Sequence, residues 1–285
     1  MSTTSPTTGG PANVSSAARP KGNVPAVERA LSVLDALAAA PEPLTLATLT
    51  VRTGLPKSSV LGLCATLARG GLVQRTSEGC YRLGVRTVDL AHAYLAHTDL
   101  TTEFVGAWES LAMPAETVVL SVLDGSDVIY VACRNGSTGL SFNYRIGMRL
   151  PAACTASGKA LLSTLTPETI AALYATNDIG NLTAHSLPNI AALCSDLERT
   201  RTRGYAIDDE ETREGMACIG APIFDSPHGT AAVAAVAISL LKAEFVTAKR
   251  DRAIETLLHF AHVLSRRLGG GIAGSAEACS RKSLP

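Results

Sequence analysis

A group of polar residues that could contact a nucleic acid follows directly on the Gly-Leu-Pro corner at residues 54–56. Gly54 suits a left-handed turn and Pro56 suits the start of a helix, so a helix is predicted from about residue 57 to 69. The start of the second helix in a helix-turn-helix enters the major groove, and its free N–H groups attract phosphate. The candidate DNA contacts there are Lys57, Ser58 and Ser59.

The rest of this helix has one apolar face and one open face. Apolar residues recur at three- and four-residue spacing and predict burial at Val60, Leu63, Cys64 and Leu67. Leu61 and Gly62 then face outward, and Leu61 joins the candidate contacts. A shorter helix before the corner carries Leu46, Leu49 and Val51 on its predicted buried face.

Two arginines flank a predicted hairpin after Gly70-Gly71. Residues 72–75 and 80–83 read as short strands joined by a turn that contains Gly79. This hairpin is predicted to be a wing, and Arg75 and Arg82 are candidate contacts to the phosphate backbone. An alternative stays open, because such helix pairs also occur in proteins that bind no nucleic acid. The charge of residues 24–84, six basic minus four acidic or +2, is a weak basic footprint.

The sequence gives little support for an enzyme. The run Thr155-Ala-Ser-Gly-Lys159 resembles a phosphate-binding loop, but Ala follows the lysine where a hydroxyl should stand. H-E-x-x-H and G-x-S-x-G patterns do not occur in the sequence. The chain is therefore predicted not to be an enzyme. An acyl-transfer site that uses Cys218 with His185 or His228 remains as an alternative.

Composition indicates two ordinary globular domains. The 285 residues are 46% hydrophobic and 18% charged with a formal net charge of +0, which argues against a surface wholly committed to nucleic acid or membrane. Seven cysteines without a C-x-x-C pair argue against disulfides and structural zinc. No cofactor and no metal are predicted.

The ends of the chain are predicted to lie outside the folded domains. Residues 1–23 are rich in Ser, Thr, Pro and Gly and lack the apolar core of a signal peptide, so a disordered leader is expected. Its Arg19 and Lys21 could act as a DNA-binding arm. The longest apolar run, residues 231–241, is too short to span a bilayer. A cytoplasmic protein without membrane contact is expected.

Periodicity and turn signals divide the chain into segments. A first helix is predicted over residues 27–39, with Val27, Leu31, Leu34 and Leu37 on its buried face. The predicted domains are a leader (1–23), a winged helix-turn-helix (24–84), a linker helix (85–98), an effector-binding domain (99–268) and a flexible tail (269–285).

The second domain is predicted to be α+β, with an antiparallel sheet of five or six strands and helices on its faces. Asp124-Gly125 joins a hairpin, and residues 140–144 can add a third strand. The other predicted strands are 204–207, 216–224 and 231–241, and the predicted helices are 100–113, 156–165, 167–174, 190–203 and 244–268.

Eight motifs in order and register make the chain resemble the IclR family of transcriptional regulators over about residues 24–268. The first domain carries VERALSVLDAL, TGLPKSSV, ATLARGGLV and YRLG. The second carries ETVVLSVLDGSDVIYV, GMRLPAACTASGKALL, RTRGYAIDDEE and GMACIGAPIFD. The resemblance implies a winged helix-turn-helix joined by a helix to a GAF-like α/β effector-binding domain.

The resemblance also implies a function and partners. The expected protein is a homodimer or homotetramer that binds a double-stranded DNA operator, acts as a repressor, and responds to a small organic acid or aromatic metabolite. The effector pocket implied for this chain consists of Ser157, Gly158, Asp208, Cys218 and Ser239. Simple structural roles stay open: Ser157 as a helix cap, Asp208 in a solvated turn and Cys218 in the core.

Two positions depart from the family pattern. Ala237 stands where the late strand usually carries a second serine, which allows a larger or more apolar effector. Gly62 stands where the recognition helix often carries a basic residue, which removes a phosphate contact. Because of Gly62, operator affinity is expected to depend more on Lys57, the wing arginines or the leader. Ala237 leaves open a regulator that works without a ligand, as a DNA-binding module alone.

Overall fold

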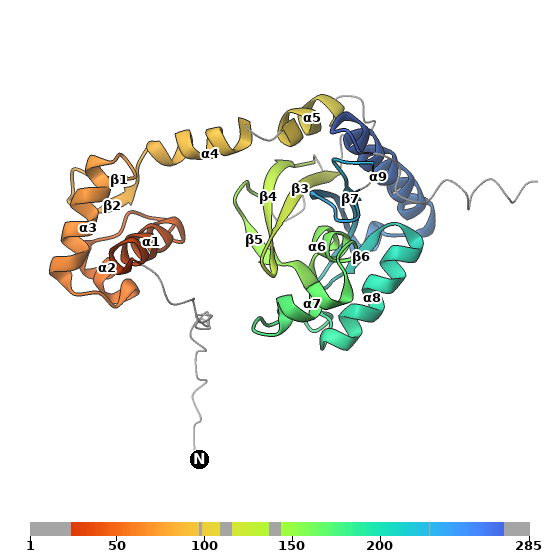
Figure 1. Cartoon of the computed structure of the whole chain (residues 1–285), viewed down its shortest axis with the longest axis horizontal. Helices are drawn as coiled ribbons and strands as arrows, with labels where there is room; N and C mark the ends of the chain where they lie inside the picture. The colour runs from red at the N-terminus through yellow and green to blue at the C-terminus, as the bar shows by residue number, and fades with distance from the viewer. Residues whose placement is uncertain (1–23, 97–98, 109–115, 137–143, 228, 271–285) are drawn as a thin grey trace, which may run out of the picture. The chain divides into compact units, whose positions relative to one another are not determined.

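The computed structural model describes residues 24–96, 99–108, 116–136, 144–227 and 229–270 (Figure 1). Contacts within the chain divide it into two compact units, with the boundary between Asp89 and Leu90. The predicted leader and most of the predicted tail lie outside the described residues. Among the described helices, none is both long and apolar enough to cross a membrane.

The first unit is a winged helix-turn-helix, as the sequence predicts. It contains α1 (Pro25–Ala38), α2 (Leu46–Thr53), α3 (Lys57–Arg69), β1 (Val73–Arg75) and β2 (Tyr81–Leu83). The two strands pair antiparallel to form the wing. The core of this unit is a single apolar cluster that joins all three helices to both strands: Val33, Leu37, Leu44, Leu49, Val60, Cys64, Val73 and Tyr81.

Local chemistry sets the corner between α2 and α3. The Thr45 hydroxyl accepts a hydrogen bond from the Thr48 N–H and caps the start of α2. Gly54 ends α2 with a φ of 67°, a left-handed conformation that glycine adopts without strain. Pro56 is the residue that precedes the first turn of α3. The recognition helix therefore begins at Lys57, as predicted.

Three residues predicted to be buried in this unit are exposed. Val51 is 81% exposed on α2, because it lies about 200° around the helix from the buried Leu49. Val27 and Leu31 on α1 are also exposed, since Val33 and Leu37 form the face that packs into the core. The apolar surface of α1 is thus wider than this unit buries.

Helix α4 (Arg86–Ala96) follows the wing, and the boundary between the units falls within it. The second unit contains a six-stranded antiparallel sheet in the order β5-β4-β3-β8-β7-β6. The strands are β3 (Thr117–Asp124), β4 (Asp127–Arg134), β5 (Arg149–Pro151), β6 (Ala206–Asp209), β7 (Met216–Ile223) and β8 (Ala234–Leu241). The predicted α+β class and antiparallel sheet are confirmed.

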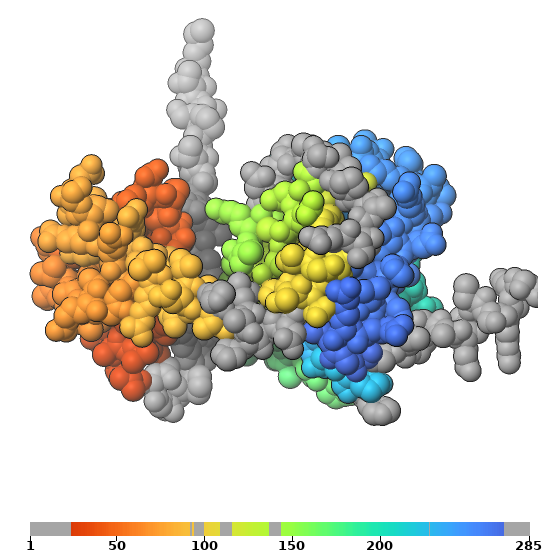
Figure 2. Space-filling view, turned by 90° about the horizontal axis from the view of Figure 1, so that it is seen from above, coloured from red at the N-terminus to blue at the C-terminus, as the bar shows by residue number. Residues whose placement is uncertain are grey.

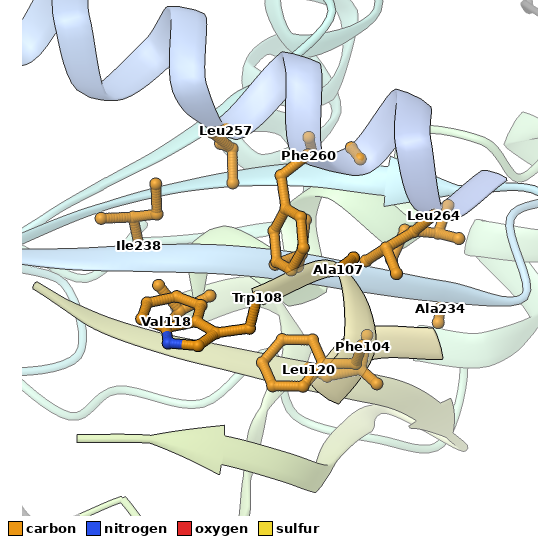
Figure 3. Close-up of a cluster of buried hydrophobic side chains, with 14 of the residues drawn as sticks. Phe104, Ala107, Trp108, Val118, Leu120, Ala234, Ile238, Leu257, Phe260 and Leu264 are labelled. Atoms are coloured by element: carbon orange, nitrogen blue, oxygen red, sulfur yellow. The ribbon is translucent and has the colours of Figure 1, made fainter. Parts of the chain in front are cut away.

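Helices cover both faces of this sheet. On one face α5 (Asp99–Trp108) and α9 (Thr247–Arg267) lie side by side (Figure 2). Their Phe104, Trp108 and Phe260 pack together over Val118 and Ile238 of the sheet (Figure 3). On the other face α6 (Ala156–Leu162), α7 (Pro167–Tyr174) and α8 (Ile190–Arg203) cover a second apolar core.

The edge beside β4 differs from the prediction. Residues 140–143 of the predicted third strand lie outside the described residues, and Tyr144 belongs to no strand. The strand that pairs with β4 on this edge is β5, which is only three residues long and ends at Pro151. Proline suits an edge strand because it cannot donate to a further neighbour. The strand was not predicted because it is short, ends in proline and is not joined to β4 by a tight turn.

Candidate functional site

Three polar residues stand in one row across neighbouring strands of the second unit. In the strand register Asp208 of β6 pairs with Cys218 of β7, and Cys218 pairs with Ser239 of β8. Directly paired residues project on the same side of a sheet. All three side chains are buried, so Asp208 is not in a solvated turn. The Cys218 thiol donates to the Ser239 hydroxyl over 3.3 Å.

The start of α6 lies close against this row, because glycine allows the approach. A Cβ on Gly220 of β7 would stand 2.4 Å from the carbonyl oxygen of Ala156. The Thr155 hydroxyl caps α6 by accepting from the Gly158 N–H over 3.0 Å, and a Cβ on Gly158 would meet the backbone of Ala152. Gly158 therefore serves the packing of α6, while Ser157 faces the row.

Two tyrosines close the space between α6 and the sheet. The Tyr144 and Ser239 hydroxyl oxygens are 2.9 Å apart, and the Cys218 sulfur is 3.8 Å from the Tyr144 hydroxyl. The ring of Tyr144 packs edge-to-face on Tyr130, with centroids 5.3 Å apart. Together these groups line one cavity: Val119, Tyr130, Tyr144, Thr155, Ala156, Ser157, Asp208, Thr212, Cys218, Ala237 and Ser239.

The cavity is small, polar and incompletely satisfied. Its volume, measured as the space open to the centre of a water molecule, is about 10 Å³, which is room for roughly one water. The Ser157 hydroxyl is buried and has no hydrogen-bond partner among the described residues. Buried polar groups are usually paired, so this hydroxyl marks a place where a ligand atom would be stabilised.

A buried ionic cluster lies behind Asp208. Lys159 of α6 is fully buried, with its ammonium 2.9 Å from Asp196 of α8 and 2.5 Å from Glu211. The N–H groups of Glu211 and Thr212 donate to Oδ1 of Asp208 at 2.8 and 3.1 Å. The segment that follows β6 is thus held both to the cavity and to α6. Lys159 belongs to this cluster and not to a phosphate loop.

The pKa values of the three buried carboxyls shift in different directions: two are raised and one is lowered. Burial raises the pKa of Asp208, and the hydrogen bonds to it from Thr212 oppose this. Burial also raises the pKa of Glu211 to about 7, against the attraction of Lys159. Burial alone would raise the pKa of Asp196, but Lys159 and two arginines hold it below its ordinary value. The two arginines pair with Asp196, which leaves one ammonium for the two buried carboxyls of Asp208 and Glu211 and favours a carboxyl that keeps its proton.

The predicted DNA-contact residues lie on the open side of the first unit. Lys57, Ser58, Arg75 and Arg82 are exposed, Ser59 is half-buried, and Leu61 is 49% exposed on α3. Nothing lies within 4 Å of the space beside Gly62. In the wing, the Arg82 guanidinium donates to Gln74, and the Arg75 guanidinium lies over the Tyr81 ring. Both arginines are held near the wing surface.

Comparison with known proteins establishes the family. A family description of the IclR helix-turn-helix domain matches residues 26–77, and one of the bacterial transcriptional regulator IclR C-terminal domain matches residues 92–266. The chain belongs to the IclR family of transcriptional regulators. It is a DNA-binding regulator with an effector-binding C-terminal domain, as predicted.

Individual relatives agree with this assignment. The chain is 32% identical over 248 residues to the transcriptional regulator XynR of Escherichia coli, covering 86% of this chain and 98% of that one. It is similar to the repressor BlcR of Agrobacterium tumefaciens at 39% identity and a TM-score of 0.55, covering 86% and 97%. An IclR homolog of Microbacterium hydrocarbonoxydans, solved with 4-hydroxybenzoate, shares the fold at 19% identity and a TM-score of 0.72, covering 85% and 98%.

The family consists of regulators and not of enzymes. The surroundings of Cys218 also do not suit a nucleophile for acyl transfer. Burial raises the pKa of Cys218 far above its usual value, so this thiol stays protonated and is a poor nucleophile. His185 is exposed, and His228 lies outside the described residues. Within the described part of the chain, no group of three His, Cys, Asp or Glu side chains could hold a metal ion.

Four of the five residues predicted for the effector pocket line the same cavity: Ser157, Asp208, Cys218 and Ser239. Gly158 is next to Ser157 but does not line the cavity; its N–H donates to the Thr155 hydroxyl, and its Cα lies against the backbone of Ala152. Sequence reasoning missed Tyr130 and Tyr144. Tyr130 is part of an alternating strand pattern and was findable as an inward residue of β4, whereas no spacing signal marks Tyr144.

Proposed function

We propose that this protein is a repressor whose binding to an operator is modulated by a small molecule held at the cavity between α6 and the sheet. The observation that carries the proposal is the buried, unpartnered Ser157 hydroxyl that faces the row of Asp208, Cys218 and Ser239. A similar protein, BlcR, is named a repressor. An operator-binding regulator works where the DNA is, which supports a cytoplasmic location.

The proposed effector is a small organic acid or aromatic metabolite. The described lining offers hydroxyls, a thiol and the Asp208 carboxyl, but no lysine, arginine or histidine. An acid bound here would therefore rely on hydrogen bonds and not on an ion pair. Ala237 keeps the wall next to Ser239 apolar, which suits a ring. The homolog solved with 4-hydroxybenzoate supports the aromatic class.

We propose that α3 reads the operator and the wing positions it. In this proposal Lys57, Ser58 and Ser59 contact phosphates and base edges, and Arg75 and Arg82 contact the backbone. Their position at the start of α3 and in the wing supports these roles, as does the exposure of all but the half-buried Ser59. The exposed Leu61 suits contact with a thymine methyl group. The recognition face carries few charges, so specificity would depend on hydroxyl and apolar contacts.

We further propose a homodimer or homotetramer. Exposed apolar residues lie on α1 (Val27 and Leu31) and around α4 (Val85, Val88 and Leu90). Apolar side chains that stay exposed one turn apart on a helix, as Val27 and Leu31 do, suit an interface. Operators of helix-turn-helix regulators are read as paired half-sites, which two copies of the chain would match.

The function is tested with purified full-length protein and the DNA upstream of its own gene. We expect that DNA to bind at least about 100-fold more tightly than random duplex in a mobility-shift titration at moderate salt. A metabolite that raises the melting temperature should change that affinity. Asp208→Ala should keep DNA binding and lose the response to the metabolite. Equal affinity for both duplexes, with and without metabolites, would refute the proposal.

One observation favours a second candidate, a DNA-binding module that works without a ligand. The cavity has room for roughly one water, and Ala237 supplies no hydrogen bond. A thermal-shift screen of small acids and phenols separates the two functions. Specific DNA binding with no stabilisation by any compound supports the module.

A further inference from the structure

We propose that Tyr144 occupies the place of the effector, so that a ligand binds by displacing its phenol, and that the ligand is a single-ring aromatic compound with one small polar group. This inference rests on the proposed effector site. It goes further by naming the residue that sets the size and chemistry of the ligand.

The phenol hydroxyl of Tyr144 already makes the contacts that a ligand would seek. It stands 2.9 Å from the Ser239 hydroxyl and 3.8 Å from the Cys218 sulfur, at the Ser239 end of the polar row. Tyr144 is 3% exposed, so this contact is made inside the protein. With the phenol there, the remaining space is about 10 Å³. A metabolite of several heavy atoms therefore requires a side chain to move.

Tyr144 differs from the other large lining residues because no sheet fixes its backbone, although the Cys133 thiol donates to its carbonyl oxygen over 3.5 Å. Val119 and Tyr130 belong to central strands, where β3 pairs with β4 and β8, and β4 pairs with β3 and β5. Strand pairing on both sides therefore holds the backbone of each of these residues in place. Tyr144 lies in no strand or helix. When the Tyr144 side chain moves out, the polar group of the ligand replaces its hydroxyl, and the sheet stays intact.

The shape that Tyr144 fills defines the ligand. One end is polar, where Ser239 and Cys218 meet the hydroxyl. The ring packs edge-to-face on Tyr130, and the apolar Val119 and Ala237 line the same cavity. The unpartnered Ser157 hydroxyl offers one further hydrogen bond on the opposite wall. A phenol or a hydroxylated or carboxylated benzene ring has this pattern of one flat apolar body and one compact polar group.

The test uses p-cresol, which is the side chain of tyrosine as a free molecule, and full-length Tyr144→Ala. We expect calorimetry to show one site per chain, with p-cresol bound at least about tenfold more tightly than by the wild type. Adding Ser239→Ala should weaken this binding about fivefold, the effect of one hydrogen bond. Toluene, which lacks the hydroxyl, should bind more weakly than p-cresol. No gain in Tyr144→Ala would overturn the proposal.

A buried tyrosine outside the cavity gives the matched control. Tyr174 lies in the same apolar core and does not line the cavity. Tyr174→Ala also creates a ring-sized hole, but p-cresol bound there should leave DNA affinity unchanged. In Tyr144→Ala, p-cresol should change the affinity for the upstream DNA about fivefold or more. The same effect in both variants, or in neither, would contradict an effector role.

Two further measurements keep the result decisive. If Tyr144→Ala shows no cooperative melting even with p-cresol, Tyr144→Phe replaces it. That variant loses only the hydroxyl, so p-cresol should bind about threefold more tightly than to the wild type, and an unchanged affinity would refute the displacement. Calorimetry uses no DNA, so a failure of operator binding would refute the proposed function without deciding the place of Tyr144.

Discussion

The most unusual residue of the second unit is Lys159, a fully buried ammonium surrounded by carboxylates. In sequence it resembles the lysine of a phosphate loop, and only the fold reveals its partners, because Asp196 and Glu211 are 37 and 52 positions away in the chain. Pairwise ionic contacts at such separations leave no periodic signal. For the same reason the ionic cluster was not predicted, whereas Asp208 was expected in the pocket only through the resemblance to the IclR family.

The pH dependence of stability is the first test of this cluster. The pKa of Glu211 rises from 4.5 to about 7 on folding, so the folded chain favours the protonated carboxyl. The stability that this provides is complete below about pH 4.5 and is lost as the pH rises through 7. Glutamine cannot ionise, so Glu211→Gln should not lose this stability. We expect the free energy of unfolding of the variant, minus that of the wild type, to rise by on the order of 1 kcal/mol between pH 5 and pH 8, as measured by urea unfolding.

Asp196→Asn is the control, because its effect on the free energy of unfolding should change with pH in the opposite direction. Because the folded pKa of Asp196 is lowered, its stabilising contribution is present at neutral pH and is lost only in acid. The variant should therefore be destabilised at pH 7, and this penalty should shrink as the pH falls through the folded pKa. Parallel pH profiles for the two variants would show that the carboxyls do not titrate as described.

At the scale of elements, helix α6 depends on close backbone contact. Its first turn touches β7 at Gly220 and the turn before it at Gly158, in both cases where no Cβ fits. Periodicity predicted α6, α7, α8 and most strands from their apolar spacing. It failed at β5, which is as short as β1 and β2 but is not joined to its partner by a tight turn, and at α1, which has apolar residues on more than one face. Those cases depend on neighbours that the local pattern does not contain.

A pair of glycine substitutions tests this contact. Gly220→Ala should destabilise the second unit by about 1–3 kcal/mol, because the added methyl overlaps the backbone of Ala156. Gly62→Ala on α3 meets open space and should stabilise the first unit by about 0.5–1 kcal/mol, the helix preference of alanine over glycine. Urea transitions of the full chain measure both. Equal effects of the two changes would show that the close approach has no energetic role.

At the scale of the whole molecule, apolar side chains remain uncovered on two helices. Val27 and Leu31 on α1 and Val88 and Leu90 on α4 are each about half exposed or more. The sequence placed the α1 pair in the core of its own unit, since an apolar stripe looks the same whether it packs within a chain or between chains. We interpret these exposed apolar residues as the contact surface of the proposed oligomer.

Charge substitutions at these positions test the oligomer. Leu31→Glu and Val88→Glu should lower the mass measured by light scattering towards that of one chain, because a buried unpaired carboxylate opposes association. Val51→Glu is the control, since Val51 is an exposed apolar residue on α2 outside both surfaces. It should leave the mass unchanged. A wild-type mass of one chain would remove the oligomer from the proposed function.

The narrow cavity also has a kinetic consequence. If a metabolite enters only when the domain opens, association cannot run at the diffusion limit, and its observed rate levels off at high ligand concentration at the speed of opening. The apparent affinity is then lowered by the small fraction of open molecules. A switch of this kind ignores brief pulses of metabolite and responds to a sustained supply.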